Sequence, residues 1–168
     1  NGVWTQQGSK LVGTGAGAAS QGSFVSLFKD TLALCGSSEP SVWIFVRSGT
    51  NWTQQGSKLL NAGAAVSVYE NTLACSNREF GKGSGVAYVY TRSGTTWTLQ
   101  TQFNTVSGRF GYSISLGSES DMVIGQYAPG VGQNLFTYSR VNNDTLTSNP
   151  NLQWNSDSLN IYGNISNT

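Results

Sequence analysis

The chain has 168 residues, and its nine basic and eight acidic side chains leave a formal net charge of +1. Such a sparse and balanced charge offers no field to attract nucleic acid or an anionic lipid surface, so we expect neither as a partner. Five Trp, seven Tyr and seven Phe stand among many Gly, Ser, Thr, Asn and Gln residues. This mixture favours short strands and tight turns, so we expect an all-β fold.

The start of the chain shows no membrane or export signal. No run approaches the roughly 18 apolar residues of a membrane-spanning helix, and residues 1–4 lack the basic start and apolar core of a signal peptide. We interpret the chain as a mature, processed or excised form, without membrane insertion.

The first predicted element lies in residues 3–12 and belongs to an internal repeat. The string WTQQGSKL occupies residues 4–11 and again residues 52–59, an interval of 48 residues. Three arginines, Arg47, Arg92 and Arg140, recur at intervals of 45 and 48 residues after similar apolar runs. A period of this length is typical of stacked supersecondary units that each need a neighbour to bury their apolar face.

Each period has the pattern of four short strands. In the first period we expect strands at about 23–29, 31–36, 42–47 and 51–60, with tight turns at Lys29-Asp30 and, one period later, at Glu70-Asn71. Four-stranded antiparallel units of this length, repeated, indicate blades of a β-propeller. Residues 3–12 then form an outermost strand whose three inner strands do not precede it.

The third period carries a family resemblance. Its order of motifs is RFGYSISL at 109–116, MVIG at 122–125, APG at 128–130 and LFTY at 135–138. This order resembles the FG-GAP repeat of integrin-α-like propellers, over approximately residues 3–141. The first two periods depart from it, because Gly22-Ser23-Phe24 and Ala64-Ala65-Val66 stand where Phe-Gly is expected. The resemblance implies the fold, and it directs attention to calcium in the loop between the first two strands of a repeat.

The predicted organisation is therefore an orphan outer strand at 3–12, periods at about 13–60, 61–104 and 105–153, and a polar segment at 154–168 that is a tail or a swapped strand. The FG-GAP-like blades cover residues 1–141. Propellers generally close with four to eight blades. We expect an incomplete propeller that is completed by another copy. The residues expected to act in the assembly strand are Trp4, Thr5, Gln6, Gln7, Lys10 and Leu11.

Catalytic and metal-binding patterns are sparse. The chain has no histidine, which removes the commonest general base and the Ser-His-Asp and Cys-His arrangements. None of the eight carboxylates lies in an acid/base motif, so we expect no enzyme and no cofactor. Only the loop of Glu119 and Asp121 holds two acids, which makes these two weak calcium candidates. Cys35 and Cys75 are candidates for one disulfide, the alternative being two small buried side chains.

Two sets of side chains suggest contact with glycans. Aromatic residues recur at matching positions: Trp43, Tyr88 and Phe136 on the third strand of each period, and Trp4, Trp52 and Trp97 on the fourth. Of these, Trp43, Trp52 and Trp97 are candidates for stacking on sugars, although aromatic packing between blades is the simpler explanation. The sequons at Asn51, Asn143 and Asn164 are glycosylation candidates. With the low charge, they favour an extracellular or cell-surface location.

The functional hypothesis is a non-enzymatic extracellular repeat protein that acts in self-assembly, as a strand-exchanged ring or filament, or in adhesion. Its expected partners are copies of itself, with glycans or extracellular proteins as further partners. The alternative is a glycan-binding propeller lectin.

Overall fold

The structure is a computed structural model and describes residues 2–17, 20–105, 108–130, 132–140, 152–155 and 158–161. The chain divides into two compact units, Asn1–Tyr138 and Ser139–Thr168, which we describe separately. Within the described residues, no helix has the length and apolar character needed to cross a membrane.

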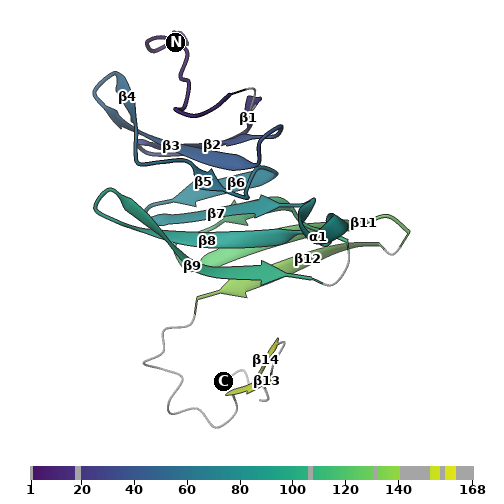
Figure 1. The fold of residues 1–168 in the computed structure, drawn as a ribbon. Coiled ribbons are helices and arrows are strands. Elements are labelled where there is room, and N and C mark those ends of the chain that lie inside the picture. Colours follow the sequence, from purple (N-terminus) through teal and green to yellow (C-terminus); the bar gives the residue numbers. More distant parts are fainter. Residues whose placement is uncertain are drawn as a thin grey trace. The chain divides into compact units, whose positions relative to one another are not determined.

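The first unit contains three antiparallel sheets, which we call blades 1 to 3 (Figure 1). Blade 1 consists of β1 (Gln21–Phe28), β2 (Thr31–Gly36), β3 (Ser41–Ser48) and β4 (Asn51–Gln54), with the short β5 (Leu59–Leu60) also paired to β3. Blade 2 consists of β6 (Ala65–Tyr69), β7 (Thr72–Asn77), β8 (Val86–Ser93) and β9 (Thr96–Asn104), with the one-turn helix α1 (Phe80–Gly83) between β7 and β8. Blade 3 consists of β10 (Arg109–Leu116), β11 (Asp121–Ala128) and β12 (Gly132–Ser139).

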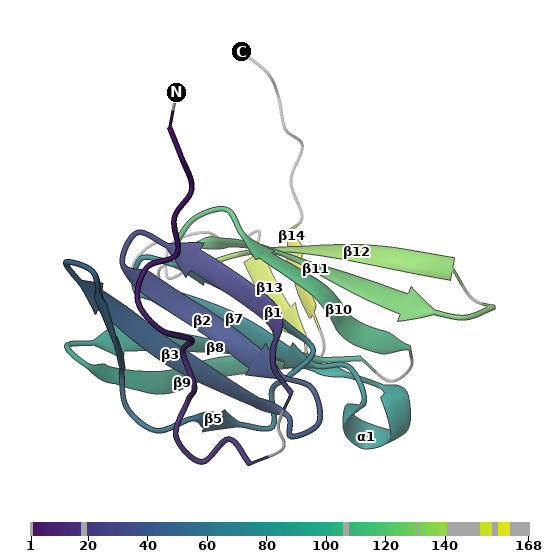
Figure 2. The same ribbon diagram turned by 90° about the horizontal axis from the view of Figure 1, so that it is seen from above.

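The three blades are stacked face to face in chain order. Their first strands are neighbours, because β1 contacts β6 and β6 contacts β10, and the view from above shows the sheets layered over one another (Figure 2). This confirms the all-β class and the blades of propeller type. The described strands form an open stack, because both outer faces lack a neighbouring sheet.

The core lies between the blades, since each sheet has apolar residues on both faces. Ala33, Cys35, Val42 and Ile44 of blade 1 pack against a set from blade 2. That set consists of Val66, Val68, Leu73, Cys75, Val86 and Tyr88. The opposite face of blade 2 packs in the same way on blade 3, through the cluster Ala74, Ala87, Val89, Phe110, Met122 and Ile124. Successive side chains along the inner strands of blade 2 therefore point to opposite faces of the sheet, and each face is buried against a neighbouring blade.

The strand register shows which residues are equivalent between blades. Thr31 pairs with Val46 in blade 1, and Thr72 pairs with Thr91 in blade 2. The segment Thr31-Leu32-Ala33 therefore matches Thr72-Leu73-Ala74. By the same count the equivalent of Cys35 is Ser76, and Cys75 takes the place of Leu34.

The outer strand expected over residues 3–12 is not paired in this structure, and its formation stays a prediction. No part of 2–17 is a strand, although the same eight letters form β4 and the start of β5 at 52–59. The copy at 51–60 is itself interrupted, because Gly56 has a φ of +70° between the two strands. In blade 1 the string pairs with β3, whereas within the described residues the copy at 4–11 pairs with no strand.

In the second unit, β13 (Leu152–Asn155) and β14 (Ser158–Ile161) form an antiparallel hairpin. It begins just before the segment 154–168 that was expected to be a tail or a swapped strand. Asn143 and Asn164, two of the three glycosylation candidates, lie outside the described residues.

Candidate functional site: the two end faces of the blade stack

A serine on the first strand of a blade binds the first strand of the next blade. The Val68 N–H donates to Ser26 Oγ at 3.0 Å, and the Leu116 N–H donates to Ser67 Oγ at 3.0 Å. These serines lie in the short motifs Val-Ser-Leu at 25–27, Val-Ser-Val at 66–68 and Ile-Ser-Leu at 114–116. The third serine, Ser115, has no further blade to bind within the described residues. We call this set the serine ladder.

The turns at one end of the blades also join neighbouring blades. Lys29 pairs with Glu70, and the Asn71 N–H donates to Glu119 at 2.9 Å. The hydrogen bond to Glu70 raises the pKa of Lys29 above its ordinary value, with the Glu70 charge as second cause. Two acids of these turns, Glu70 and Glu119, therefore connect neighbouring blades.

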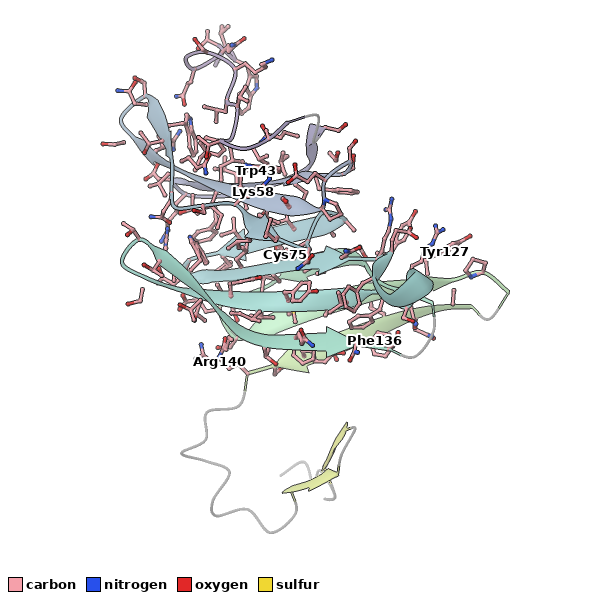
Figure 3. The ribbon with its side chains drawn as sticks, in the orientation of Figure 1. Trp43, Lys58, Cys75, Tyr127, Phe136 and Arg140 are labelled. Atoms are coloured by element: carbon pink, nitrogen blue, oxygen red, sulfur yellow. The ribbon has the colours of Figure 1, made fainter. Side chains whose placement is uncertain are left out.

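The recurring arginines lie over the recurring tryptophans of the outer strands. The guanidinium carbon of Arg47 lies 5.2 Å from the Trp52 ring centroid, and that of Arg92 lies 5.1 Å from the Trp97 centroid. Arg92 also donates to the carbonyl of Glu70 at 3.0 Å, so its guanidinium joins the outer strand to the turns. The third arginine, Arg140, follows β12 and is exposed; Figure 3 marks its place in the chain.

Residues 7–16 lie along blade 1 without joining its sheet. The Trp43 Nε1–H donates to the Thr14 carbonyl at 3.0 Å, and Arg47 donates to Gln7 Oε1 at 3.4 Å. A Cβ on Gly13 would lie 2.1 Å from the Trp43 ring, so only glycine permits this approach. Leu11 packs against the cluster that contains Trp43. The segment is therefore held at its C-terminal end.

Residues 2–6, just before this segment, are exposed to solvent. Trp4 is 100% exposed, whereas its equivalents Trp52 and Trp97 are half-buried under arginines. Gln55 of the second copy accepts a hydrogen bond from Trp97 of blade 2 at 2.9 Å. Gln7 is the equivalent of Gln55 and lies beside Arg47 of blade 1. Residues 7–11 thus follow the path of a connection from a preceding blade.

Burial excludes Trp43 from sugar stacking, whereas the half-buried Trp52 and Trp97 stay candidates. Trp43 is completely buried, and the ammonium of Lys58 lies 5.6 Å from its ring centroid (Figure 3). Lys58 is held there by Glu39 and by the Gly15 carbonyl. One face of the Trp52 ring and one face of the Trp97 ring are covered by arginine. The matching positions of the aromatic residues are therefore explained by packing within and between blades.

The outer face of blade 1 is apolar and partly uncovered. Val25 and Leu27 on β1 are 63% and 60% exposed. Their equivalents on β6, Val66 and Val68, are 8% and 5% exposed, because blade 1 covers them. A face built like an internal interface therefore lies open at the start of the stack.

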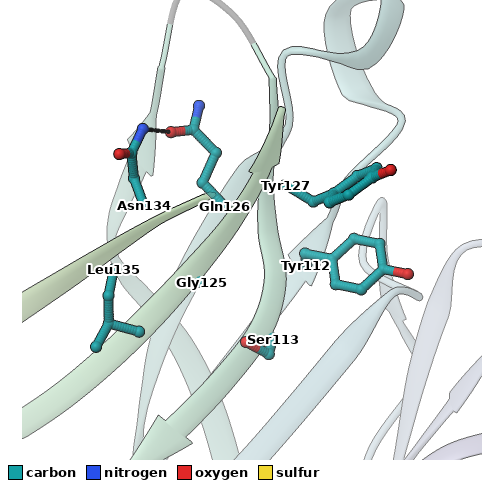
Figure 4. A pocket seen from close by; sticks show the side chains of 7 residues that line it. All are labelled: Tyr112, Ser113, Gly125, Gln126, Tyr127, Asn134 and Leu135. Atoms are coloured by element: carbon teal, nitrogen blue, oxygen red, sulfur yellow. Dashed lines mark hydrogen bonds between the residues drawn. The ribbon is translucent and has the colours of Figure 1, made fainter. Parts of the chain in front are cut away.

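The outer face of blade 3 is the second open surface. It contains a shallow hollow of about 380 Å³ lined by Tyr112, Ser113, Gly125, Gln126, Tyr127, Asn134 and Leu135 (Figure 4). Leu135 is 70% exposed, because its neighbours Phe136 and Tyr138 turn toward blade 2. Asn134 donates to Gln126 at 3.1 Å. No carboxylate, lysine or arginine lines the hollow, so its surface is uncharged.

The weak calcium candidates do not form a metal site in the described residues. The Glu119 carboxylate accepts the Asn71 N–H, and the Asp121 carboxylate accepts the Ser118 hydroxyl at 2.9 Å. No group of three or more Cys, Asp or Glu side chains comes together in the part of the chain that the structure describes.

The glycosylation candidate Asn51 is exposed at the start of β4, where a glycan has room.

The two cysteines are free and buried, so the expected disulfide is corrected. Both thiols lie in the cluster between blades 1 and 2. Cys35 lies on β2 of blade 1 and Cys75 on β7 of blade 2, and the two are not bonded to each other. Burial raises the pKa of Cys35 to about 12 and raises that of Cys75 as well.

Sequence reasoning missed the serine ladder. A signal was present, because an apolar-Ser-apolar triplet recurs just before each of the three turns. It was hidden because serine is abundant in this chain and the triplets are spaced by 41 and 48 residues.

No protein-family model matches the chain, and no curated protein matches it in sequence. Among solved structures the chain is similar to the N-terminal domain of Nup159, with a TM-score of 0.49 and 11% sequence identity. The match covers 70% of this chain and 34% of that one, so the chain spans about a third of the structure that it matches. The resemblance to FG-GAP repeats stays a prediction.

Proposed function

We propose that this chain is a non-enzymatic, extracellular repeat protein of the FG-GAP type that assembles with copies of itself. In this proposal the N-terminal segment of one copy adds as a fourth strand to blade 3 of another copy. The observation that carries the proposal is the wholly exposed Trp4 in a string whose second copy is already an outer strand.

Blade 3 offers the matching vacancy. Blades 1 and 2 each have a fourth strand beside their third, whereas in the described residues β12 pairs only with β11. The edge of β12 that faces away from β11 can present backbone donors and acceptors to a partner strand. In the described part of the chain Trp4–Gln6 pairs with no strand, so donation breaks no pair seen there.

The register of the donated strand follows from blade 1. There Trp52 pairs with Arg47 and Thr53 pairs with Val46. Because Arg140 is the third member of the arginine series, Trp4 of the donor would lie opposite Arg140 and Thr5 opposite Ser139. The arginine would then lie over the Trp4 ring, as in the other two blades. Lys58, the equivalent of Lys10, pairs with Glu39 in the loop between β2 and β3. The corresponding loop of blade 3, at 129–131, holds no acid, so Lys10 gains no ion pair in this arrangement.

The Phe-Gly pair supports the choice of family. Phe110 is completely buried between blades 2 and 3, and Gly111 has a φ of +78°. The Ser76 hydroxyl donates to the Gly111 carbonyl at 2.6 Å, and a Cβ on Gly111 would lie 2.5 Å from the Ser76 Cβ. An aromatic anchor followed by glycine therefore has a packing role between blades.

Two neighbouring proline substitutions test strand donation. In blade 1 the Gln55 N–H donates to the Ile44 carbonyl at 2.8 Å, so the N–H of Thr53, two residues earlier, also faces β3. Thr5 is its equivalent, and Thr5→Pro removes a donor that would face β12. Gln6→Pro is the control, because its N–H points away from the partner and proline is tolerated there on an edge strand.

The expected result is that Thr5→Pro and Trp4→Ala shift the protein from assemblies to monomers, measured by light scattering after size-exclusion chromatography. Gln6→Pro should keep the assembled state. Equal behaviour of the two proline variants, or a monomeric parent chain, would refute strand donation. Far-UV circular dichroism checks that each variant is folded.

A further inference from the structure

We infer that copies also dock face to face, with the outer face of blade 3 of one copy against the outer face of blade 1 of the next. This rests on the proposed self-assembly and identifies a second interface for it. The interface would continue the contacts that already join blades 1, 2 and 3 within one copy.

The apolar contacts of the interface are present on blade 1. The pair Val25 and Leu27 occupies the positions that Val66 and Val68 occupy on blade 2, where they are buried against blade 1. The same positions on blade 3 hold Ile114 and Leu116, which pack against blade 2. Three blades thus carry one apolar pair toward a preceding blade, and among the described residues the pair on blade 1 is the one left uncovered.

The receiving face is present on blade 3. Leu135 is exposed there, and Val123 shares the face of its pair partner Ser115. Their counterparts on blade 2, Ala87 and Ala74, are buried by blade 3. No charged side chain is among the residues that line the hollow on this face. An uncharged sheet surface matches the uncharged Val25 and Leu27.

The serine ladder supplies the polar contact. Ser26 accepts the N–H of Val68, and Ser67 accepts the N–H of Leu116. Ser115 is the next acceptor in this series, and Leu27 is the equivalent of Val68 and Leu116. Docking would let the Leu27 N–H of the next copy donate to Ser115 Oγ, which extends the ladder from one copy to another.

The β-bulge of β1 at Gly22 also has a matching site, on blade 3. The pairing of β1 and of β10 shifts register at the same place, after Gln21 and after Phe110. Gly111 of the second bulge packs on Ser76, whereas Gly22 of the first, with a φ of +89°, has nothing within 4 Å of where its Cβ would lie. In blade 3 the position of Ser76 is taken by Gly125, and the Ser113 hydroxyl lies 2.4 Å from where a Gly125 Cβ would be. Ser113 can therefore take the role of Ser76.

A second copy is the occupant that these contacts specify, because each end face carries the half that the other lacks. The two faces differ, so the contact is head to tail and builds a ring or a filament rather than a two-fold dimer. Strand donation acts in the same direction, since both interfaces join blade 3 of one copy to the N-terminal end of the next.

Leu27→Asp and Ser115→Ala test the docked face. Leu27→Asp places a charge in the interface and should abolish assembly, whereas Leu99→Asp on β9, a leucine that is 47% exposed, is the matched control and should not. Ser115→Ala should weaken association about two- to tenfold, the effect of one hydrogen bond. It should leave the urea midpoint of the dissociated chain unchanged, because Ser115 binds no further blade in the part of one copy that the structure describes.

The outcomes separate the two proposals. If Leu27→Asp stays assembled while Thr5→Pro dissociates, face docking is refuted and strand donation stands. If Leu27→Asp dissociates while Thr5→Pro stays assembled, face docking stands alone. A parent chain that is monomeric in native mass spectrometry refutes both. Far-UV circular dichroism and the urea midpoint of Leu27→Asp exclude simple misfolding.

Discussion

Replacement of Trp43 by alanine should remove the largest single packing contribution in blade 1. The side chain has no exposed surface and lies under the segment of Leu11 and Gly13. A buried tryptophan covers about 150–250 Å², which at about 25 cal/mol per Å² corresponds to about 4–6 kcal/mol. Buried Trp→Ala substitutions in proteins typically cost about 3–5 kcal/mol, which overlaps the lower part of this range. We therefore expect a loss of about 4 kcal/mol, which includes the hydrogen bond to Thr14.

Urea unfolding followed by far-UV circular dichroism measures this loss, at a protein concentration where all variants share one oligomeric state. Trp97→Ala is the control and should cost about half as much, because Trp97 is only half-buried. A double-mutant cycle with Gly13→Ala isolates the contact. That substitution clashes with the Trp43 ring in the parent and should become nearly neutral in Trp43→Ala. A Trp43→Ala cost below about 1.5 kcal/mol, or no coupling to Gly13, would refute the packing described for blade 1.

Three further predictions concern contacts between blades. Gly111→Ala should destabilise the chain by at least about 2 kcal/mol, and by more than Gly22→Ala does in dissociated chains. Both glycines have positive φ, but only Gly111 packs on Ser76, so equal urea midpoints of the two variants would contradict this. Arg92→Lys should cost about 1–2 kcal/mol, because lysine cannot make the three contacts to Thr31, Glu70 and Asn71 at once, and a thermal midpoint equal to the parent would count against it. Native Cys35 and Cys75 should resist iodoacetamide at pH 8, as read by mass spectrometry, and rapid alkylation of the folded chain would show that the thiols are exposed. The free energy of unfolding should fall as pH rises from about 9 toward 12, because the thiols of the unfolded chain ionise while the buried Cys35 thiol, with its pKa raised to about 12, stays neutral.

Much of the fold could be predicted from the sequence, because the repeat is written in local signals. The strand expected at 31–36 matches β2, and the one expected at 42–47 lies within β3. Alternating apolar residues and paired turn residues report directly on a sheet that is covered on both faces. The equivalence of Trp43, Tyr88 and Phe136 is likewise visible, since each lies on the third strand and faces the preceding blade or segment.

The orphan strand could not be predicted from its letters, because a strand is a property of a pair. The string WTQQGSKL is a strand at 52–54, where β3 lies beside it, and is not one at 4–11. The free cysteines and the contacts of Glu70 and Glu119 could not be predicted for the same reason, because they depend on which blades are neighbours in space. The end faces emerged only when Val25 could be compared with its covered equivalent Val66.

The central claim is that this chain joins head to tail with copies of itself. Native mass spectrometry of the unmodified 168-residue chain, over a dilution series, tests it most directly. We predict integer multiples of the chain mass, either one closed number or an open series that lengthens with concentration. A single monomer peak at every concentration would contradict the claim.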